Sequence, residues 1–140
     1  MLDMQLELVL IPVADVDRAK TFCTETMGFK LEIDTTLGDG RRVVQMTPPG
    51  SACSIAVGTG ITDAAPGSVV GTHLVVTDIV AVRDALVDRG VEVSESRHIA
   101  SGQWVPGPDP QRADYMSFAD FSDPDGNTWV LQERGNGSRP

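Results

Sequence analysis

Side chains that can perform acid–base, nucleophilic or metal chemistry are few in this sequence. The 140 residues include two histidines, His73 and His98, and two cysteines, Cys23 and Cys53. These four residues form no CxxC pair and no His-rich cluster. The sequence also contains no G-x-S-x-G elbow, no P-loop and no dinucleotide-binding glycine pattern. Catalytic divalent sites usually take about three protein ligands. The sequence therefore predicts no metal site and no cofactor.

The charge and hydropathy of the chain limit the classes of partner that it can bind. The formal net charge is -9, and no basic stripe suited to a nucleic acid is present. No apolar run approaches the roughly 20 residues of a membrane helix, and Met1–Leu8 lacks the basic region of a signal peptide. We therefore expect a cytoplasmic protein with no nucleic-acid or membrane partner. The negative charge favours a cationic ligand, although acidity can also serve solubility alone.

The elements that would position a site come as an internal repeat. Val13-Ala-Asp-Val16 and Val76-Thr-Asp-Ile79 each close a strand-like run and open a helical pattern. Both helical patterns space their apolar residues 3, 3 and 1 apart, which predicts one apolar face per helix. These residues are Val16, Ala19, Phe22 and Cys23 in the first helix, and Ile79, Val82, Ala85 and Leu86 in the second.

Helix ends and strands repeat as well. Asp15 and Asp78 are the expected N-caps, and Gly28 and Gly90 stand where the helices should end. Alternating or apolar strand patterns follow each helix. They cover Phe29–Ile33, Arg42–Thr47 and Ser54–Val57 in the first half, and Val91–Val93, Tyr115–Phe121 and Thr128–Gln132 in the second.

Loops complete the expected architecture. A long loop is expected from about Ile99 to Ala113, Asp123-Pro-Asp-Gly-Asn127 is expected as a tight turn, and residues 135–140 as a frayed tail. Each half then reads βαβββ, at about 5–58 and 70–133 of a single domain over 1–134. The predicted fold class is α+β, with the two modules forming a cup-shaped curved sheet and the helices outside. A small ligand would sit on the concave face.

These motifs resemble the vicinal oxygen chelate superfamily of glyoxalases, bleomycin resistance proteins and dioxygenases. The resemblance lies in Val13-Ala-Asp-Val-Asp-Arg-Ala19 with Met27-Gly-Phe29, and in Phe121-Ser-Asp-Pro-Asp-Gly-Asn127 with Leu131-Gln-Glu133. It covers roughly residues 5 to 133. It implies paired βαβββ modules, commonly a homodimer, with a site in each cup.

The resemblance also implies where metal ligands would stand in the metal-dependent members. Those members carry His or Glu at positions that correspond here to Leu8, Gly71 and Val130. The fourth position, near Cys53–Val57, also offers neither residue. The chain thus departs from the metal-binding pattern at every aligned position, and a metal-dependent glyoxalase or ring-cleaving dioxygenase is disfavoured.

Strand parity from the aligned positions predicts the residues that line the cup. On the apolar strands these are Leu8, Leu10, His73, Thr128, Val130 and Gln132, and Trp104 is added from the long loop as a surface on which a planar ligand could stack. Glu7 and Glu133 would point away, as surface or capping acids. Trp104 could instead pin the loop to the body, and Gln132 could face water.

His73 is the sharpest catalytic candidate. Its imidazole could be a general acid/base or a hydrogen-bond anchor. The alternative is a histidine tied to a backbone carbonyl, with no chemistry.

Three functions follow, with ligand and reaction left open. The first is metal-independent binding of a small organic molecule, as in the antibiotic-binding resistance branch. The second is a lyase or isomerase of the glyoxalase type that uses His73. The third is a metal enzyme that uses an unusual ligand set around His73 and Glu133. The fold does not choose among these functions, because one scaffold hosts many chemistries.

Overall fold

The structure, a computed structural model, describes residues 1–134. The chain divides into two units, one of residues 1–69 with 123–127, the other of residues 70–122 and the chain from 128 onward. The expected frayed tail, 135–140, lies outside the described residues. No helix within 1–134 is long and apolar enough to cross a membrane.

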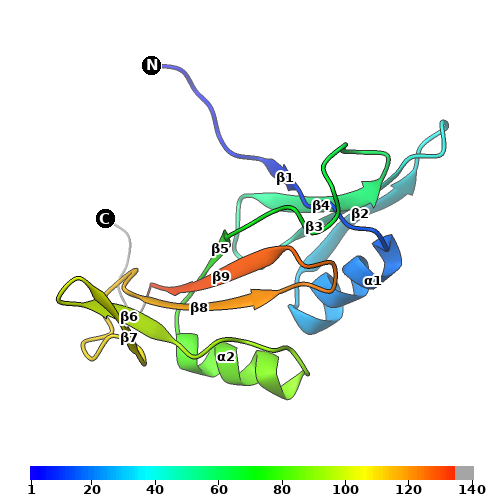
Figure 1. Cartoon of the computed structure of the whole chain (residues 1–140). Helices are drawn as coiled ribbons and strands as arrows, with labels where there is room; N and C mark the ends of the chain where they lie inside the picture. The colour runs from blue at the N-terminus through cyan, green and yellow to red at the C-terminus, as the bar shows by residue number, and fades with distance from the viewer. Residues whose placement is uncertain (135–140) are drawn as a thin grey trace. The chain divides into compact units, whose positions relative to one another are not determined.

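The first unit contains one helical segment and a four-stranded sheet (Figure 1). The helix α1 spans Val16–Thr21 and continues as a π-helical turn, η1, over Phe22–Thr26. The strands are β1 (Leu8–Leu10), β2 (Lys30–Thr36), β3 (Arg42–Thr47) and β4 (Ser54–Thr59). Their order is β1-β4-β3-β2, with β1 parallel to β4 and the other pairs antiparallel.

The second unit repeats this topology with one strand more. It has the helix α2 (Ile79–Asp88) and the strands β5 (Thr72–Val76), β6 (Arg97–Ala100), β7 (Gln103–Pro106), β8 (Ser117–Ser122) and β9 (Thr128–Glu133). The sheet order is β5-β9-β8-β6-β7, and β5 is parallel to β9. In both units the strand before the helix pairs in parallel with the last strand. This confirms the predicted α+β class with two βαβββ modules.

The helices begin and end as predicted. Asp15 Oδ1 accepts a hydrogen bond from the backbone N–H of Arg18 at 3.0 Å, and Asp78 Oδ1 accepts one from Ala81 at 3.1 Å. Gly28 and Gly90 follow the helices with φ of 77° and 87°. Only glycine adopts this left-handed conformation without a steric cost, so it ends each helix cleanly.

Two predictions in the second half are wrong. The expected loop from Ile99 to Ala113 contains the β6–β7 hairpin, because Ser101 and Gly102, with φ of 53° and 75°, form a tight turn between two strands. The expected strand Val91–Val93 is reduced to a single bridge from Val93 to Phe121. The strand that pairs with β8 begins instead at Arg97.

Each sheet packs its apolar residues against its own helix. In the second unit, β9 alternates strictly: Trp129, Leu131 and Glu133 are buried and the residues between them are half-buried. In the first unit, Val44 and Met46 of β3 are fully buried. The opposite face of each sheet is therefore the more exposed one.

The turn between β8 and β9 belongs to the first unit. Asn127 is fully buried there. Its amide nitrogen donates to Pro12 O at 2.9 Å and to Asp123 Oδ2 at 3.0 Å, while its amide oxygen accepts from Val69 N at 3.1 Å. Asp125 Oδ1 accepts from Ala14 N at 2.9 Å. The Asp-Pro-Asp-Gly-Asn motif thus anchors backbone beyond its own turn.

Candidate functional site

The helix-free face of the second sheet brings together most of the predicted site residues. Directly paired residues of neighbouring strands point to the same face of a sheet. His73 pairs with Val130, and Val130 pairs with Asp120. Gln132 lies two residues from Val130 and shares its face. We call this surface the β5–β9 face. It carries five predicted residues, namely His73, Trp104, Thr128, Val130 and Gln132.

A second row of the β5–β9 face runs across the whole sheet. Val75 pairs with Gln132, Gln132 with Phe118, and Phe118 with Arg97. Trp104 joins from β7, where it pairs with Ile99, two residues from Arg97. Several of these side chains are open to solvent: Trp104 is 53%, Ile99 45% and Val75 44% exposed. A folded protein rarely leaves so many large apolar groups on one sheet face without a use for them.

Trp104 is held by two neighbours. The Arg97 guanidinium lies over its ring, with Cζ 4.8 Å from the centroid, and the Phe118 ring meets it edge-on at 5.5 Å. Arg97 is itself fixed by two hydrogen bonds to Asp120, at 2.9 Å and 3.1 Å. A cation over a ring face is attracted by the ring's quadrupole. The indole is therefore pre-positioned, although it sits on a hairpin and not on the expected loop.

His73 is exposed, and its Nδ1 lies 2.6 Å from the carbonyl oxygen of Gly71. The neutral ring then carries its proton on Nδ1, which donates to this carbonyl, and Nε2 is the nitrogen with a lone pair. The tie to a backbone carbonyl, one of the two predicted alternatives, is thus present. It orients the ring and leaves Nε2 chemically competent.

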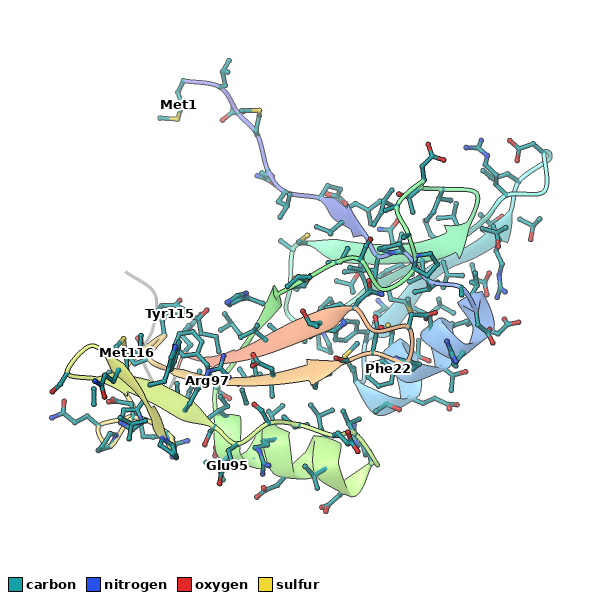
Figure 2. All side chains as sticks on the ribbon, in the orientation of Figure 1. Met1, Phe22, Glu95, Arg97, Tyr115 and Met116 are labelled. Atoms are coloured by element: carbon teal, nitrogen blue, oxygen red, sulfur yellow. The ribbon has the colours of Figure 1, made fainter. Side chains whose placement is uncertain are left out.

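Two other predicted residues already serve the backbone. Thr128 Oγ1 accepts from Gly71 N at 2.8 Å. Gln132 Nε2 donates to Tyr115 O at 3.2 Å, which leaves the amide oxygen outside that bond. Figure 2 shows Arg97, Tyr115 and Met116 toward the same end of this sheet. The segment after β7 therefore borders the β5–β9 face.

A buried ion pair fixes that segment. Glu133 is 1% exposed and accepts from the backbone N–H of Ile79 at 2.8 Å, at the start of α2. Arg112 donates to both carboxylate oxygens, at 2.8 Å and 2.6 Å, and to Asp78 at 3.2 Å. The Arg112 guanidinium holds the pKa of Glu133 below its ordinary value. Glu133 is thus a capping acid, as one alternative had it, and not a surface acid.

Leu8 and Leu10 lie in the first unit and share the helix-free face of its sheet. Leu10 pairs with Ala56, Ala56 with Gln45, and Gln45 with Ile33. Leu8 is 37%, Leu10 38% and Ile33 45% exposed. This face is aliphatic, in contrast to the aromatic and charged β5–β9 face.

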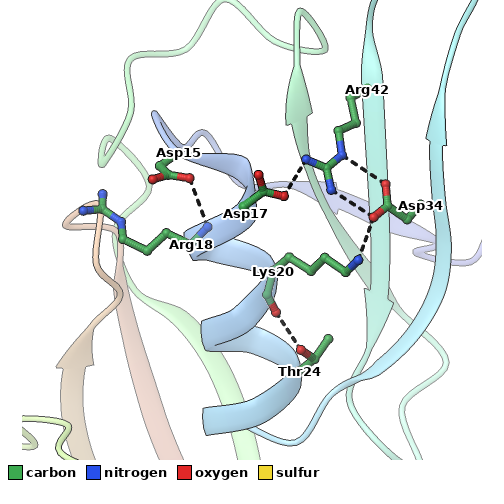
Figure 3. A network of polar contacts seen from close by, with 7 residues as sticks. All are labelled: Asp15, Asp17, Arg18, Lys20, Thr24, Asp34 and Arg42. Carbon is green, nitrogen blue, oxygen red and sulfur yellow. Dashed lines mark hydrogen bonds and ion pairs between the residues drawn. The ribbon is translucent and has the colours of Figure 1, made fainter.

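The helix side of the first sheet carries a charge network and no candidate site (Figure 3). Arg42 donates to both oxygens of Asp34, at 3.0 Å and 2.9 Å, and to Asp17 at 2.8 Å. Lys20 reaches Asp34 at 2.7 Å. Arg42 and Lys20 together hold the pKa of Asp34 well below its usual range. The network ties α1 to β2 and β3.

The residues do not fit the metal centre that some members of the resembling superfamily hold. Leu8, Gly71 and Val130 have no donor side chain. Within residues 1–134, no three His, Cys, Asp or Glu residues lie close enough to hold a metal ion.

The signals that could have revealed Arg97, Phe118 and Asp120 are weak in the sequence. All three reach the β5–β9 face through the register of β6 and β8 with β9. That register depends on turn lengths that periodicity does not supply. The Ser101-Gly102 pair was the one available hint of a hairpin.

Two βαβββ units, each with a helix on one sheet face and an exposed opposite face, define a two-module α+β protein. The chain belongs to the Glyoxalase/Bleomycin resistance protein/Dioxygenase superfamily, whose family model matches residues 5–131. Comparison with the curated proteins gives no significant match.

Solved structures agree in fold. An antibiotic binding protein, TnmS3, from Streptomyces sp. CB03234 is 32% identical with a TM-score of 0.76, covering 96% of this chain and 99% of that one. A glyoxalase/bleomycin resistance protein from the same organism is 33% identical, with a TM-score of 0.71 and coverage of 91% and 99%. A superfamily member from Sphaerobacter thermophilus DSM 20745 is 28% identical, with a TM-score of 0.74 and coverage of 94% and 98%.

Proposed function

We propose that this chain binds a small organic molecule on the β5–β9 face, without a metal ion. The observation that carries the proposal is the β5–β9 face, where Trp104 stands 53% exposed yet braced by Arg97 and Phe118. Leu8 and Leu10, which were also predicted to line the cup, lie on the helix-free face of the first unit. The similarity to an antibiotic binding protein supports an antibiotic-like ligand.

The ligand class follows from the side chains. An indole that is already held in place loses little conformational freedom when a planar ring stacks on it. The amide oxygen of Gln132 can accept a hydrogen bond from a hydroxyl or amine. The net charge of -9 favours a ligand that carries a positive charge. The proposed ligand is therefore an amphipathic aromatic compound, preferably a cation.

The proposed setting is the cytoplasm, and the proposed assembly is a homodimer, as the resemblance implies. No nucleic acid or membrane is proposed as a partner, because the acidic chain would be repelled by phosphate and by anionic lipid.

Isothermal titration calorimetry tests the proposal, because this readout does not depend on Trp104. Protein treated with a chelator is titrated with a panel of planar aromatic antibiotics, and the bound compound is recovered and weighed by mass spectrometry. Binding with the compound recovered unchanged is expected. Trp104→Ala should weaken binding about tenfold or more, within the range of a stacking anchor. Val80→Ala, which trims an exposed residue of α2, is the matched control. Binding that requires added metal would refute the proposal.

A second candidate function is a lyase or isomerase with His73 as acid/base. It is favoured by the oriented imidazole, whose Nδ1 lies 2.6 Å from Gly71 O. The same panel would then yield altered product. His73→Ala should abolish product formation while the compound still binds. Unchanged turnover in this variant would remove His73 from the mechanism.

A further inference from the structure

The segment between β7 and β8, residues 107–116, is anchored along its length to the second unit. At its start, Gly107 N donates to Ser96 O at 2.7 Å. In its middle, Asp109 N donates at 2.8 Å to the hydroxyl oxygen of Ser117, which is fully buried. All of these partners lie within the second unit. The 107–116 segment is therefore part of the same body as the β5–β9 face that it borders.

Two residues near the end of this segment hold one residue of β9 from two sides. Arg112 donates to both carboxylate oxygens of Glu133, at 2.8 Å and 2.6 Å, and Tyr115 N donates to the backbone carbonyl of Glu133 at 2.6 Å. Arg112 and Tyr115 have φ of 50° and 65°. Large side chains disfavour this left-handed conformation, which persists only where surrounding contacts impose it, often at ligand clamps. Here the contacts with Glu133 impose it.

Gln132, the neighbour of Glu133 on β9, depends on this arrangement. Its Nε2 donates to the carbonyl oxygen of Tyr115 at 3.2 Å. A carbonyl oxygen only accepts, so it can pair with the amide nitrogen of Gln132 and never with the amide oxygen. One N–H of the amide is thus used, whereas both lone pairs of its oxygen stay outside this bond. Gln132 lies on the β5–β9 face, where it pairs with Val75 and Phe118.

We propose that the 107–116 segment sets the ligand specificity of the β5–β9 face. Arg112 holds Glu133 and Tyr115 in place, and the Tyr115 carbonyl then orients the Gln132 amide so that its oxygen selects ligands that donate a hydrogen bond. Arg112 is a positioning residue, because it acts through Gln132 and not by contact with the ligand. The inference rests on the proposed binding function and narrows its ligand class to planar compounds with an amino or hydroxyl group.

A role of Arg112 in stability alone would have a different consequence. Its removal would then destabilise the chain without changing how the folded chain ranks its ligands. If Arg112 orients Gln132, its removal lets the Tyr115 carbonyl move and the amide rotate. Either the nitrogen or the oxygen of the amide can then face the ligand, so that the ranking of ligands changes as well.

Two dyes of equal charge test the ranking by isothermal titration calorimetry. Proflavine and acridine orange are planar acridine cations, but the amino groups of proflavine donate hydrogen bonds and those of acridine orange are dimethylated. We expect Gln132→Leu to lower the preference for proflavine about fivefold, the contribution of one net hydrogen bond. Arg112→Ala should lower it by a similar factor, and the double variant should lower it no further, because the two residues act in series. The charge lost with Arg112 affects both dyes alike and leaves their ratio unchanged.

Two further variants separate specificity from stability. Asn127→Ala removes buried hydrogen bonds in the first unit and should destabilise the chain comparably, yet it should keep the native preference. Arg112→Lys keeps the positive charge but loses the two-pronged guanidinium contact. It is the milder change if Arg112→Ala does not fold, and it should lower the preference at least about twofold, a fraction of one hydrogen bond. Circular dichroism confirms that each variant is folded at the temperature of the titration.

The amide of Gln132 can also be followed without a ligand. Its side-chain N–H signals in ¹⁵N NMR spectra are assigned by their loss in Gln132→Leu. In the native chain they should exchange slowly with solvent, because one N–H is held by the Tyr115 carbonyl. Exchange should be several-fold faster in Arg112→Ala and unchanged in Asn127→Ala.

The outcomes separate this inference from the proposed function. If neither dye binds the native chain, the proposed function fails and the inference falls with it. If both dyes bind and the preference survives Gln132→Leu or the folded Arg112 variant, the segment does not set specificity and the binding function still stands. An equal loss of preference in Asn127→Ala would overturn the inference in the same way. Loss confined to the Gln132 and Arg112 variants, with faster exchange of the Gln132 amide, supports it.

Discussion

At the scale of single residues, the buried carboxylate of Glu133 is the charge in the second unit that costs the most desolvation free energy. The Glu133 side chain is 1% exposed and is neutralised by Arg112, which is 40% exposed. A buried carboxylate is tolerated only when it is paired and hydrogen-bonded. Glu133 meets both conditions, with two bonds from Arg112 and one from Ile79 N. Its pairing fixes the segment that borders the β5–β9 face.

Removal of Arg112 should therefore destabilise the fold. Arg112→Ala leaves Glu133 buried without its cation. We expect a loss of about 2–3 kcal/mol in the free energy of unfolding, below the roughly 3–5 kcal/mol of a fully buried pair, because Arg112 is 40% exposed. The measurement is urea unfolding at pH 7. Arg41→Ala breaks an exposed pair with Asp39, where the side chains are 51% and 55% exposed, and should cost far less, because solvent screens an exposed ion pair. Equal losses in both variants would contradict this account.

The same pair sets an acid dependence. Because the pKa of Glu133 is lowered in the folded chain, its stabilising effect is present above the ordinary carboxyl pKa. It is lost as the pH falls through the folded pKa. The stability difference between the native chain and Arg112→Ala should thus shrink as the pH falls below about 4.3, the ordinary pKa of Glu. A difference that stays constant down to pH 3 would show that Glu133 does not mediate it.

At the scale of elements, local chemistry could be predicted and long-range register could not. The helix caps at Asp15 and Asp78 depend on contacts between residues that are three apart in the sequence. The sequence alone is therefore enough to predict these caps and the glycines that end the helices. The parity of β9 follows from period two. Its consequence, that Thr128, Val130 and Gln132 share a face, is confirmed by the alternating burial.

The β6–β7 hairpin shows why the sequence did not predict the neighbours of Trp104 on the β5–β9 face. Pro106, Pro108 and Pro110 favour a loop over a strand, yet β7 ends at Pro106, before the other two, and the turn is Ser101-Gly102. Proline at the last position of an outer strand removes no needed backbone donor. The misplaced hairpin hid the neighbours of Trp104, because Arg97 reaches the indole only through strand pairing.

The short Asp123–Asn127 turn should contribute to stability through side-chain hydrogen bonds to distant backbone groups. Asn127→Ala would leave Val69 N and Pro12 O without this side chain in a buried place, and an unsatisfied buried group costs about 1–3 kcal/mol. We expect a loss of about 2–3 kcal/mol, measured by thermal and urea unfolding. Pro124→Ala, at an exposed position of the same turn, should cost less than about 1 kcal/mol. If the two variants lost equal stability, the conformation of the turn, and not the hydrogen bonds of Asn127, would be what stabilises the fold.

At the scale of the whole molecule, charge should act on ligand choice more than on fold. The net charge of -9 produces a negative potential that reaches across the surface at low salt, and salt screens it within about 10 Å at 0.1 M. The Arg97–Asp120 pair is neutral as a unit, so the long-range field and not this pair would attract a cation. The stacking contribution of Trp104, in contrast, is insensitive to salt.

Two aromatic compounds that differ only in charge separate these contributions. A cationic dye should bind several-fold more weakly when the salt concentration rises from about 0.02 M to about 0.3 M, because the screening length falls from roughly 20 Å to roughly 6 Å. A neutral analogue of the same ring system should keep its affinity, measured by isothermal titration calorimetry. Trp104→Ala should weaken both compounds equally and leave the salt dependence of the cation in place. If the two compounds respond alike to salt, charge plays no part in recognition and the ligand is selected by its ring system alone.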